Sequence, residues 1–376
     1  MTALLDTVDP EGLLEYSVVF TDRSLNHMSQ TFRTVMTDIG AMMKEVYHAD
    51  AVAIIPGGGT YAMEAVARQF AQDAKVLLVR NGWFSFRWSQ ILDAGDFAGE
   101  ATVMKARAAG NAATSPFAPA PIEEVTARIL AEKPDIVFAP HVETSAGIIL
   151  PDEYVTALAA AAHEVGALMV LDCIASGCVW VDMKATGVDV LISAPQKGWS
   201  ASPSAGVVMM SDRAVARMEG TSSNSFAVDL NKWHQIMLAY EGGGHAYHAT
   251  MPTDALRGFR DTMLETREYG FEKLKENQWA LGRAVRALLA EKGVQSVAAD
   301  GFGAPGVVVS YTDDPDIQNG SKFAAFGMQI AAGVPLQVDE PAGFMTFRLG
   351  LFGLDKLYDV EGAVARLRAV LDQVFP

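Results

Sequence analysis

The chain has few cysteines. Only two, Cys173 and Cys178, occur among its 376 residues. They are too close in sequence for a disulfide between them to cross-link distant parts of a domain, and no second pair exists to complete a zinc site. We therefore expect a reduced, cytoplasmic protein without a bound metal.

Positive charge and long apolar runs are also scarce. The chain has 29 Lys and Arg and 45 Asp and Glu, which gives a formal net charge of −16. Nucleic acids and anionic membranes both favour clustered Lys and Arg, so neither is an expected partner. No stretch approaches 18 apolar residues, which argues against a membrane span. The first residues, MTALLDTVDPEGLLEY, carry acids where a signal peptide needs bases, so we expect no secretion.

Short apolar runs alternate with segments of helical spacing between about residues 50 and 210. This alternation predicts an α/β protein whose mainly parallel sheet is covered by helices on both faces. The apolar runs occupy residues 51–56, 75–80, 135–140, 168–172, 188–193 and 206–211.

The pattern changes near residue 254. A long amphipathic stretch begins there, and Thr253 and Asp254 carry the signal of a helix cap. Shorter β-like pieces (306–312 and 344–353) and a closing helix (359–374) follow. We predict an N-terminal segment (1–24), a large domain (25–253), and a connecting helix with a small α+β domain (254–376). Residues 106–121 are expected to form an irregular loop.

A single lysine stands in the segment VLISAPQKGWSASPSAG, residues 190–206. A lysine just past a strand end, among small residues, forms a Schiff base when a neighbouring cation or desolvation lowers its pKa. Taken alone, Lys197 is more simply a surface lysine.

Asp172 ends the apolar run 168–172. A carboxylate at the C-terminal end of a parallel strand points into the crevice where such sheets bind ligands. In pyridoxal phosphate (PLP) enzymes an acid there pairs with the pyridine nitrogen. The alternative is an N-cap for a helix that follows.

The segment IIPGGGTYAMEAVA (54–67) is a strand, a triple glycine and a helix start. Glycines let the backbone approach an anion, and Thr60 and the free helix N–H groups supply donors. The Gly57–Ala62 spacing also satisfies a dinucleotide fingerprint. That fingerprint needs an acid after the next strand, where Arg80 and Asn81 stand instead, so a phosphate site is favoured.

Two loops, NGWFSFR (81–87) and HVETSAG (141–147), follow predicted strands and are expected at the same sheet edge. Phe84 or Trp83 is a candidate to stack on a flat ring, and Thr144 to hydrogen-bond a ring hydroxyl. Packing in the core is the alternative for the aromatic residues.

Arg348 lies in the apolar segment FMTFRLGLFG. An arginine in so apolar a setting generally has a carboxylate partner, because its planar fork binds one bidentately. That partner is either a substrate or a protein acid.

Together these segments resemble the class V aminotransferases of PLP fold type I, closest to the alanine–glyoxylate and serine–pyruvate aminotransferase group. The match runs from about Asn26 to the C-terminus. It implies a large domain with a mainly parallel seven-stranded sheet and a smaller C-terminal α+β domain. It also implies that Lys197 forms the internal aldimine with pyridoxal 5′-phosphate.

The resemblance assigns further roles by segment. LDCIAS places Asp172 at the pyridinium nitrogen, with Ile174 against one ring face. NGWFSFR places Phe84 as the stacking ring, where tryptophan is more usual, and HVETSAG places Thr144 near the ring oxygen. FRLGLFG makes Arg348 the group that binds the substrate carboxylate. The expected phosphate contacts are Gly58, Gly59, Thr60 and Gln196, with Tyr247 and Thr250 of AYHATMP reaching the neighbouring subunit's phosphate in a homodimer.

One segment departs from the family. A Gly-Pro-Gly-Pro type of segment commonly lines the substrate pocket, whereas this chain has EYSVVFTDRSLNHMS at 15–29. Bulk and Arg23 replace the glycines, so Arg23 becomes a candidate substrate-binding residue, for a second acidic group on the donor.

The resemblance implies transfer of an amino group from a small amino acid to a small 2-oxoacid such as glyoxylate or pyruvate. A PLP-dependent lyase, acting by deamination or β-elimination, would use the same residues. A cysteine desulfurase is disfavoured, because Gln196 precedes the lysine and both cysteines adjoin Asp172. A non-enzymatic phosphate-binding protein or a structural homo-oligomer would leave most of these residues unexplained.

Overall fold

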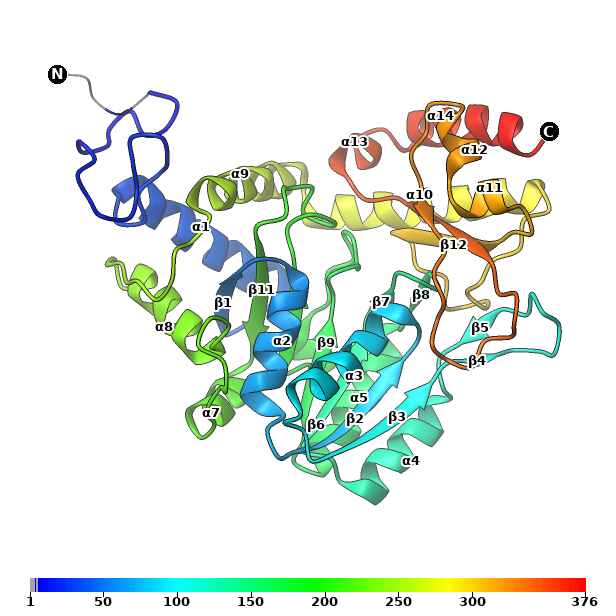
Figure 1. The fold of residues 1–376 in the computed structure, drawn as a ribbon, viewed down its shortest axis with the longest axis horizontal. Helices are drawn as coiled ribbons and strands as arrows, with labels where there is room; N and C mark the ends of the chain where they lie inside the picture. Colours follow the sequence, from blue (N-terminus) through cyan, green and yellow to red (C-terminus); the bar gives the residue numbers. More distant parts are fainter. Residues whose placement is uncertain (1–3, 5) are drawn as a thin grey trace.

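A computed structural model describes residue 4 and residues 6–376 (Figure 1). The first residues of the predicted N-terminal segment (1–3 and 5) lie outside the described residues. A seven-stranded sheet organises the first half of the chain, in the order β1-β11-β10-β9-β6-β2-β3. Its strands are β1 Ala51–Pro56, β2 Lys75–Arg80, β3 Glu100–Lys105, β6 Ile136–Pro140, β9 Leu168–Asp172, β10 Val190–Ser193 and β11 Ala205–Met210.

The predicted mainly parallel sheet is confirmed. Only β11 runs antiparallel to its neighbours, β1 and β10, and the other adjacent pairs are parallel. Each of the six apolar runs becomes a strand. The seventh strand, β3, has no apolar run because it lies at the sheet edge, where only Met104 is buried.

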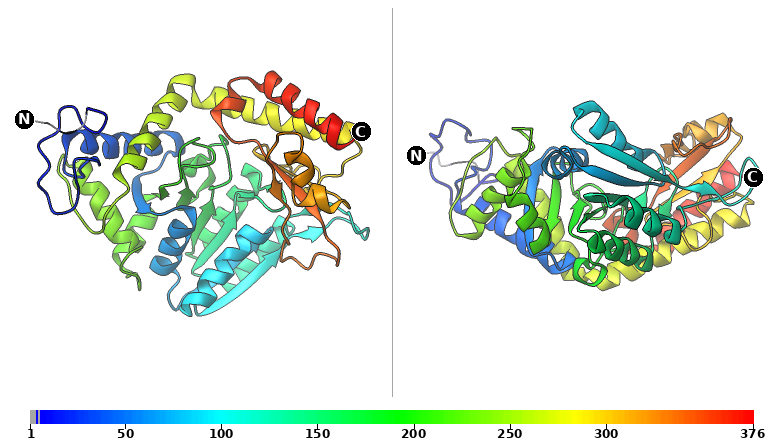
Figure 2. Two further views of the ribbon diagram at one scale, coloured as in Figure 1. Left: turned by 45° about the horizontal axis from the view of Figure 1, so that its top comes forward. Right: turned by 90° about the horizontal axis from the view of Figure 1, so that it is seen from below.

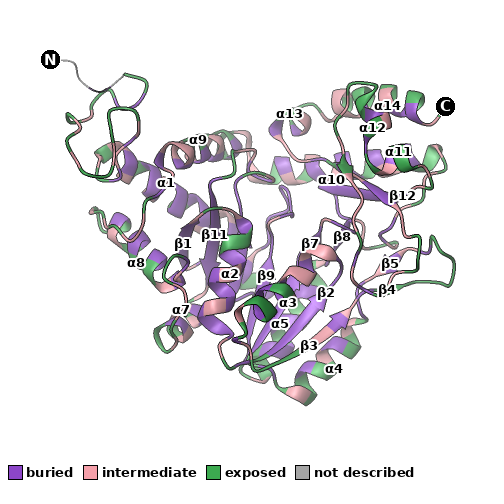
Figure 3. Cartoon of the chain, in the orientation of Figure 1, coloured by how far each residue is buried: buried purple, intermediate pink, exposed green. Residues whose placement is uncertain are grey.

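Helices cover both faces of this sheet. In Figure 1, α2 and α3 lie in front of it, and α5 packs against β6 and β9 from behind. Figure 3 shows the strands between these layers as buried and the outer helix faces as exposed. The helices of this part are α1 Gln30–Tyr47, α2 Gly59–Phe70, α3 Trp83–Gly95, α4 Ile122–Glu132, α5 Asp152–Glu164, α6 Met183–Thr186, α7 Asp212–Glu219 and α8 Leu230–Glu241.

The long amphipathic stretch forms two helices, α9 Thr253–Tyr269 and α10 Phe271–Glu291. Gly270 separates them at φ +106°, a conformation that L side chains rarely adopt. The predicted cap was wrong: Thr253 is already helical, and the N-cap is Pro252. The Asp254 carboxylate instead accepts a hydrogen bond from the backbone N–H of Leu25 at 3.3 Å. This bond connects the segment before α1 to α9.

The C-terminal part carries a smaller antiparallel sheet in the order β12-β14-β13, packed against α10. Figure 2 shows it beside the larger sheet, with α14 along α10. Its elements are β12 Val307–Tyr311, α11 Pro315–Gln318, α12 Ser321–Ala324, β13 Ala331–Ala332, β14 Thr346–Gly350, α13 Leu354–Leu357 and α14 Val360–Val374.

Residues 106–121 are not wholly irregular, as the sequence had suggested. Strands β4 Arg107–Ala108 and β5 Phe117–Ala118 pair across a turn. The Phe117 N–H also bonds to the carbonyl of Val297 at 2.7 Å, and its ring joins a second apolar core. The hairpin β7 Val142–Glu143 and β8 Ile148–Ile149 contributes to that core as well. Residues on both sides of position 254 share it, so the domain bounds stay a prediction.

None of the helices in the described part of the chain is both long and apolar enough to cross a membrane.

Candidate active site

A pocket of about 180 Å³ opens where the strands of the large sheet end. Ligands bind at this edge in open α/β sheets. Most of the candidate residues chosen from the sequence line it, although they come from five separate segments of the chain. The lining residues are Gly59, Thr60, Met63, Phe84, Arg87, Val142, Thr144, Asp172, Ile174, Ala175, Gln196 and Lys197.

Lys197 lies half-buried in this pocket. Among the described residues its amine has no hydrogen bond and no ion pair with another side chain. Burial lowers its pKa from the ordinary value, and the Arg87 and Arg348 cations act in the same direction, against Asp172. A lysine with a lowered pKa presents more of its neutral amine, which is the nucleophilic form.

Asp172 is buried at the end of β9, with 7% of its surface exposed. Its Oδ1 accepts the N–H of Ile174 at 2.9 Å. Burial raises the pKa of this carboxyl to about 6, despite that hydrogen bond and the charge of Lys197. It caps no helix, because the next one, α6, has Asp182 as its N-cap. A buried acid facing a pocket fits a cationic ligand group.

The glycine-rich turn leads into the N-terminus of α2. Gly58 is the N-cap and supplies no side-chain hydrogen bond, so the first helix N–H groups keep their donor capacity. A Cβ on Gly59 would overlap the side chain of Ile174, whereas a Cβ on Gly58 would meet nothing within 4 Å. The turn therefore leaves open space beside free donors, an arrangement suited to an anion.

Phe84 lies at the start of α3 with three cations around its ring. The Arg87 guanidinium carbon lies 5.1 Å from the ring centroid, and the Lys197 amine and the Arg348 guanidinium carbon each lie 5.7 Å away. Arg348 is half-buried and donates from Nε to the carbonyl of Ala332 at 2.8 Å. In the part of the chain that is described, it forms no ion pair with a carboxylate.

Glu143 is a site residue that sequence reasoning missed. Its carboxylate is fully buried and accepts the backbone N–H groups of Phe84, Ser85 and Ser145 at 2.9–3.1 Å. The hydroxyls of Ser85 and Ser145 also donate to it, at 2.6 and 2.7 Å. It therefore fixes the turn that carries Phe84. The available signal was an acid beside Thr144 in a strand-end loop.

Replacing Glu143 by alanine is expected to lower the free energy of unfolding by about 3 kcal/mol or more, because it leaves buried N–H donors unpaired. Denaturant unfolding measures this. The matched control is Glu124→Ala, which breaks an exposed ion pair with Arg107 and is expected to change the free energy of unfolding far less, because solvent screens that pair. Equal losses for the two variants would contradict the role of Glu143.

Five candidate residues do not line the pocket of the single chain: Gly58, Arg348, Tyr247, Thr250 and Arg23. Tyr247 and Thr250 are exposed, and their hydroxyls hydrogen-bond each other at 2.8 Å. Arg23 is also exposed and lies 3.8 Å from Asp22. Their roles in the site stay predictions.

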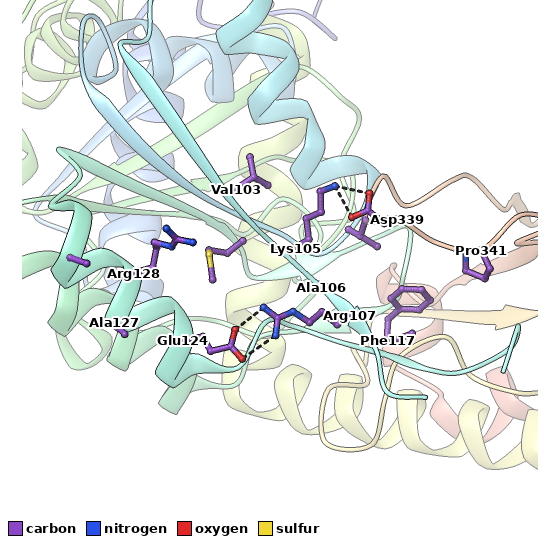
Figure 4. Close-up of a pocket in the computed structure, with 14 residues that line it drawn as sticks. Val103, Lys105, Ala106, Arg107, Phe117, Glu124, Ala127, Arg128, Asp339 and Pro341 are labelled. Atoms are coloured by element: carbon purple, nitrogen blue, oxygen red, sulfur yellow. Dashed lines mark hydrogen bonds and ion pairs between the residues drawn. The ribbon is translucent and has the colours of Figure 1, made fainter. Parts of the chain in front are cut away.

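A larger hollow of about 880 Å³ lies elsewhere, along the edge strand β3 (Figure 4). Figure 4 shows its two ion pairs, Lys105 with Asp339 and Arg107 with Glu124. None of the candidate site residues lines it.

Comparison with known families identifies the family of the chain. The model of the aminotransferase class-V family matches residues 8–301. The chain belongs to this family. It is therefore a PLP-dependent aminotransferase, and the family resemblance inferred from the sequence is confirmed.

Similar proteins agree over most of the chain. A Synechococcus protein named soluble hydrogenase, small subunit, is 25% identical over 93% of this chain and 88% of its own length. Alanine–glyoxylate aminotransferase 1 of Saccharomyces cerevisiae is 25% identical over 83% of this chain and 82% of its own. The crystal structure of alanine–glyoxylate aminotransferase from Nostoc has a TM-score of 0.76 at 21% identity, covering 94% of this chain and 89% of that one. The last likeness confirms the fold.

The residues of the pocket fit the cofactor of this aminotransferase family. An unpaired lysine amine suits the cofactor aldehyde, and a buried carboxylate suits a pyridinium nitrogen. Ile174 leaves no room for a Cβ at Gly59, so the bare backbone at the start of α2 suits a phosphate.

Proposed function

We propose that this aminotransferase moves an amino group from a small amino acid to a small 2-oxoacid such as glyoxylate or pyruvate, in the cytoplasm. The observation that carries the proposal is that Lys197 and Asp172 share one pocket with Phe84, whose ring also lies beside Lys197 and Arg348. The name of the yeast relative supports glyoxylate as an acceptor.

Each residue near the ring has a distinct task. When bound, PLP supplies an electron sink for the bond changes at the substrate Cα. Lys197 would hold the cofactor and, once displaced, carry a proton to and from the substrate as a general base. Asp172 would keep the ring nitrogen protonated, Phe84 and Ile174 would enclose the ring, and Thr144 would hydrogen-bond its oxygen.

The phosphate would be held at the start of α2. Gly58, Gly59 and Thr60 would donate hydrogen bonds from the backbone and the hydroxyl, and Gln196 would add its side-chain amide.

Arg348 would bind the substrate carboxylate. It has no carboxylate partner among the described residues, and its planar fork suits one. Arg348→Gln is expected to lower kcat/KM for the amino donor about 10²-fold, because a charge-assisted hydrogen bond is lost. Arg348→Lys should restore part of this loss. Steady-state kinetics with a fixed oxoacid measures it, and unchanged kcat/KM in Arg348→Gln would contradict the assignment.

We further propose a homodimer in which Tyr247 and Thr250 of one subunit reach the phosphate held by the other. Both side chains are exposed in the single chain, and neither lines the pocket of its own chain. Leu13, Tyr16 and Val18 are nearly fully exposed, and a cluster of large apolar side chains on a surface favours burial against another protein.

Arg23 follows these apolar residues and would reach the active site across the same interface, where it reads a second acidic group on the donor. Arg23→Ala should then weaken dicarboxylic or sulfonated donors and spare alanine. Equal kinetics across donors would remove Arg23 from the site.

Product analysis tests the reaction type. The enzyme, an amino donor and glyoxylate should yield glycine and the oxoacid of the donor in equal amounts, without ammonia. Ammonia released in the absence of an acceptor oxoacid would instead establish the lyase alternative.

A further inference from the structure

Arg87 lines the pocket but was given no role by its sequence motif. It lies on α3, one turn beyond Phe84, and its side chain crosses to α2. There its Nη1 donates to the Thr60 hydroxyl at 2.9 Å. The guanidinium carbon lies 5.1 Å from the Phe84 ring centroid, so the ring holds it in place.

This guanidinium has unused hydrogen-bonding capacity. Its only hydrogen-bond partner among the described residues is the neutral Thr60 hydroxyl, and no carboxylate there forms an ion pair with it. An arginine carries five N–H donors and is strongly favoured beside phosphate and carboxylate groups. A half-buried arginine left in this state indicates an anionic ligand.

The negative charge of the expected cofactor phosphate also favours a role for Arg87. The candidate phosphate contacts, Gly58, Gly59, Thr60 and Gln196, are all neutral, and the N-terminus of α2 adds only a partial positive charge. Of the pocket-lining residues in the described part of the chain, only Lys197 and Arg87 are cationic. Lys197 is committed to the cofactor aldehyde, which leaves Arg87 beside the phosphate site.

We propose that Arg87 pairs with the cofactor phosphate, held in position by Thr60 and by the ring of Phe84. It would supply the full positive charge that the neutral turn lacks. This inference rests on the proposed placement of the phosphate at the start of α2.

Binding of PLP and of pyridoxal, which lacks the phosphate, separates this role from others. The cofactor-free protein is titrated with each compound, and quenching of tryptophan fluorescence gives the dissociation constant. Arg87→Gln is expected to bind PLP about 10- to 100-fold more weakly, the effect of losing a hydrogen bond to a charged group. The dissociation constant of pyridoxal should change less than about twofold. Arg87→Lys should bind PLP more weakly than the wild type and more tightly than Arg87→Gln.

The matched control is Arg128→Gln, which removes the same charge from an exposed position paired with Glu132. It should leave both dissociation constants unchanged. The double variant Arg87→Gln with Thr60→Val should lose less PLP affinity than the sum of the single variants, because the two side chains act together.

Several outcomes would overturn the proposal. Equal weakening of PLP and pyridoxal would mean that Arg87 supports the ring through Phe84. Unchanged PLP affinity with a raised KM for the donor would make Arg87 a substrate residue. A weakened dimer with normal PLP affinity, seen by sedimentation, would mean that it pairs with the other subunit. Failure of the wild-type protein to distinguish PLP from pyridoxal would instead remove the phosphate site itself.

Discussion

Lys197→Ala is expected to lower kcat by about 10⁴-fold or more, because one substitution removes both the attachment point of the cofactor and the general base. The lysine is placed for both tasks: its amine is unpaired in the described residues, lies 5.7 Å from the Phe84 ring and has a lowered pKa. Borohydride reduction of the wild-type holoenzyme followed by peptide mass analysis should find the cofactor on the peptide that contains Lys197.

Lys184→Ala provides the control. That lysine is exposed and pairs with Asp50 on the surface, so its loss should leave the activity and the labelled peptide unchanged. Cofactor found on another lysine, or turnover retained by Lys197→Ala, would contradict the assignment of Lys197.

Asp172→Asn has the second-largest expected effect, and it should change activity and stability in opposite directions. Loss of the buried charge facing the ring nitrogen is expected to cost about 3 kcal/mol or more, as for other broken buried ion pairs. This corresponds to a loss of about 10²-fold or more in kcat. Asparagine keeps the oxygen that accepts the Ile174 N–H, so the fold around it should persist.

In the cofactor-free protein, Asp172→Asn should increase the free energy of unfolding instead. Burial raises the pKa of Asp172 from 3.8 to about 6, so between these values the folded chain binds the proton more tightly than the unfolded chain. Its contribution to stability is therefore present below about pH 4 and is lost as the pH rises to about 6. Asp172→Asn should raise the free energy of unfolding of the apoprotein at pH 7 by about 3 kcal/mol.

Denaturant unfolding of both apoproteins at pH 4, 5, 6 and 7 measures this difference. The gap between variant and wild type should widen with pH and then level off. A variant less stable than wild type at pH 7 would mean that the carboxylate is satisfied within the apoprotein, against its assignment as the partner of a cationic ring.

Much of the large sheet could be predicted because its central strands are buried on both faces and therefore read as continuous apolar runs. The edge strand β3 was missed, because Glu100 and Ala101 are exposed and Thr102 is only half-buried, so the strand contains no continuous apolar run. The division of the long helix at Gly270 was also missed, because a lone glycine does not by itself reveal a positive φ.

The candidate site divides in the same way. Residues at strand ends, such as Asp172, Thr144 and Lys197, could be chosen because topology alone places strand ends together. Glu143 and Arg87 act through contacts between segments distant in sequence: Glu143 contacts the turn at Phe84, and Arg87 contacts Thr60. Only the folded structure shows those contacts. The proposed roles of Tyr247 and Thr250 need a second subunit and rest on the family resemblance, whereas Arg23 was chosen because its segment departs from the family.

The central proposal, reversible amino transfer by a cofactor on Lys197, is tested most directly by the visible absorption spectrum of the purified protein. A yellow band should bleach when one amino acid of a panel is added and return when glyoxylate or pyruvate follows. A band that forms but never recovers with an oxoacid, or no band even after PLP is supplied, would contradict the proposal.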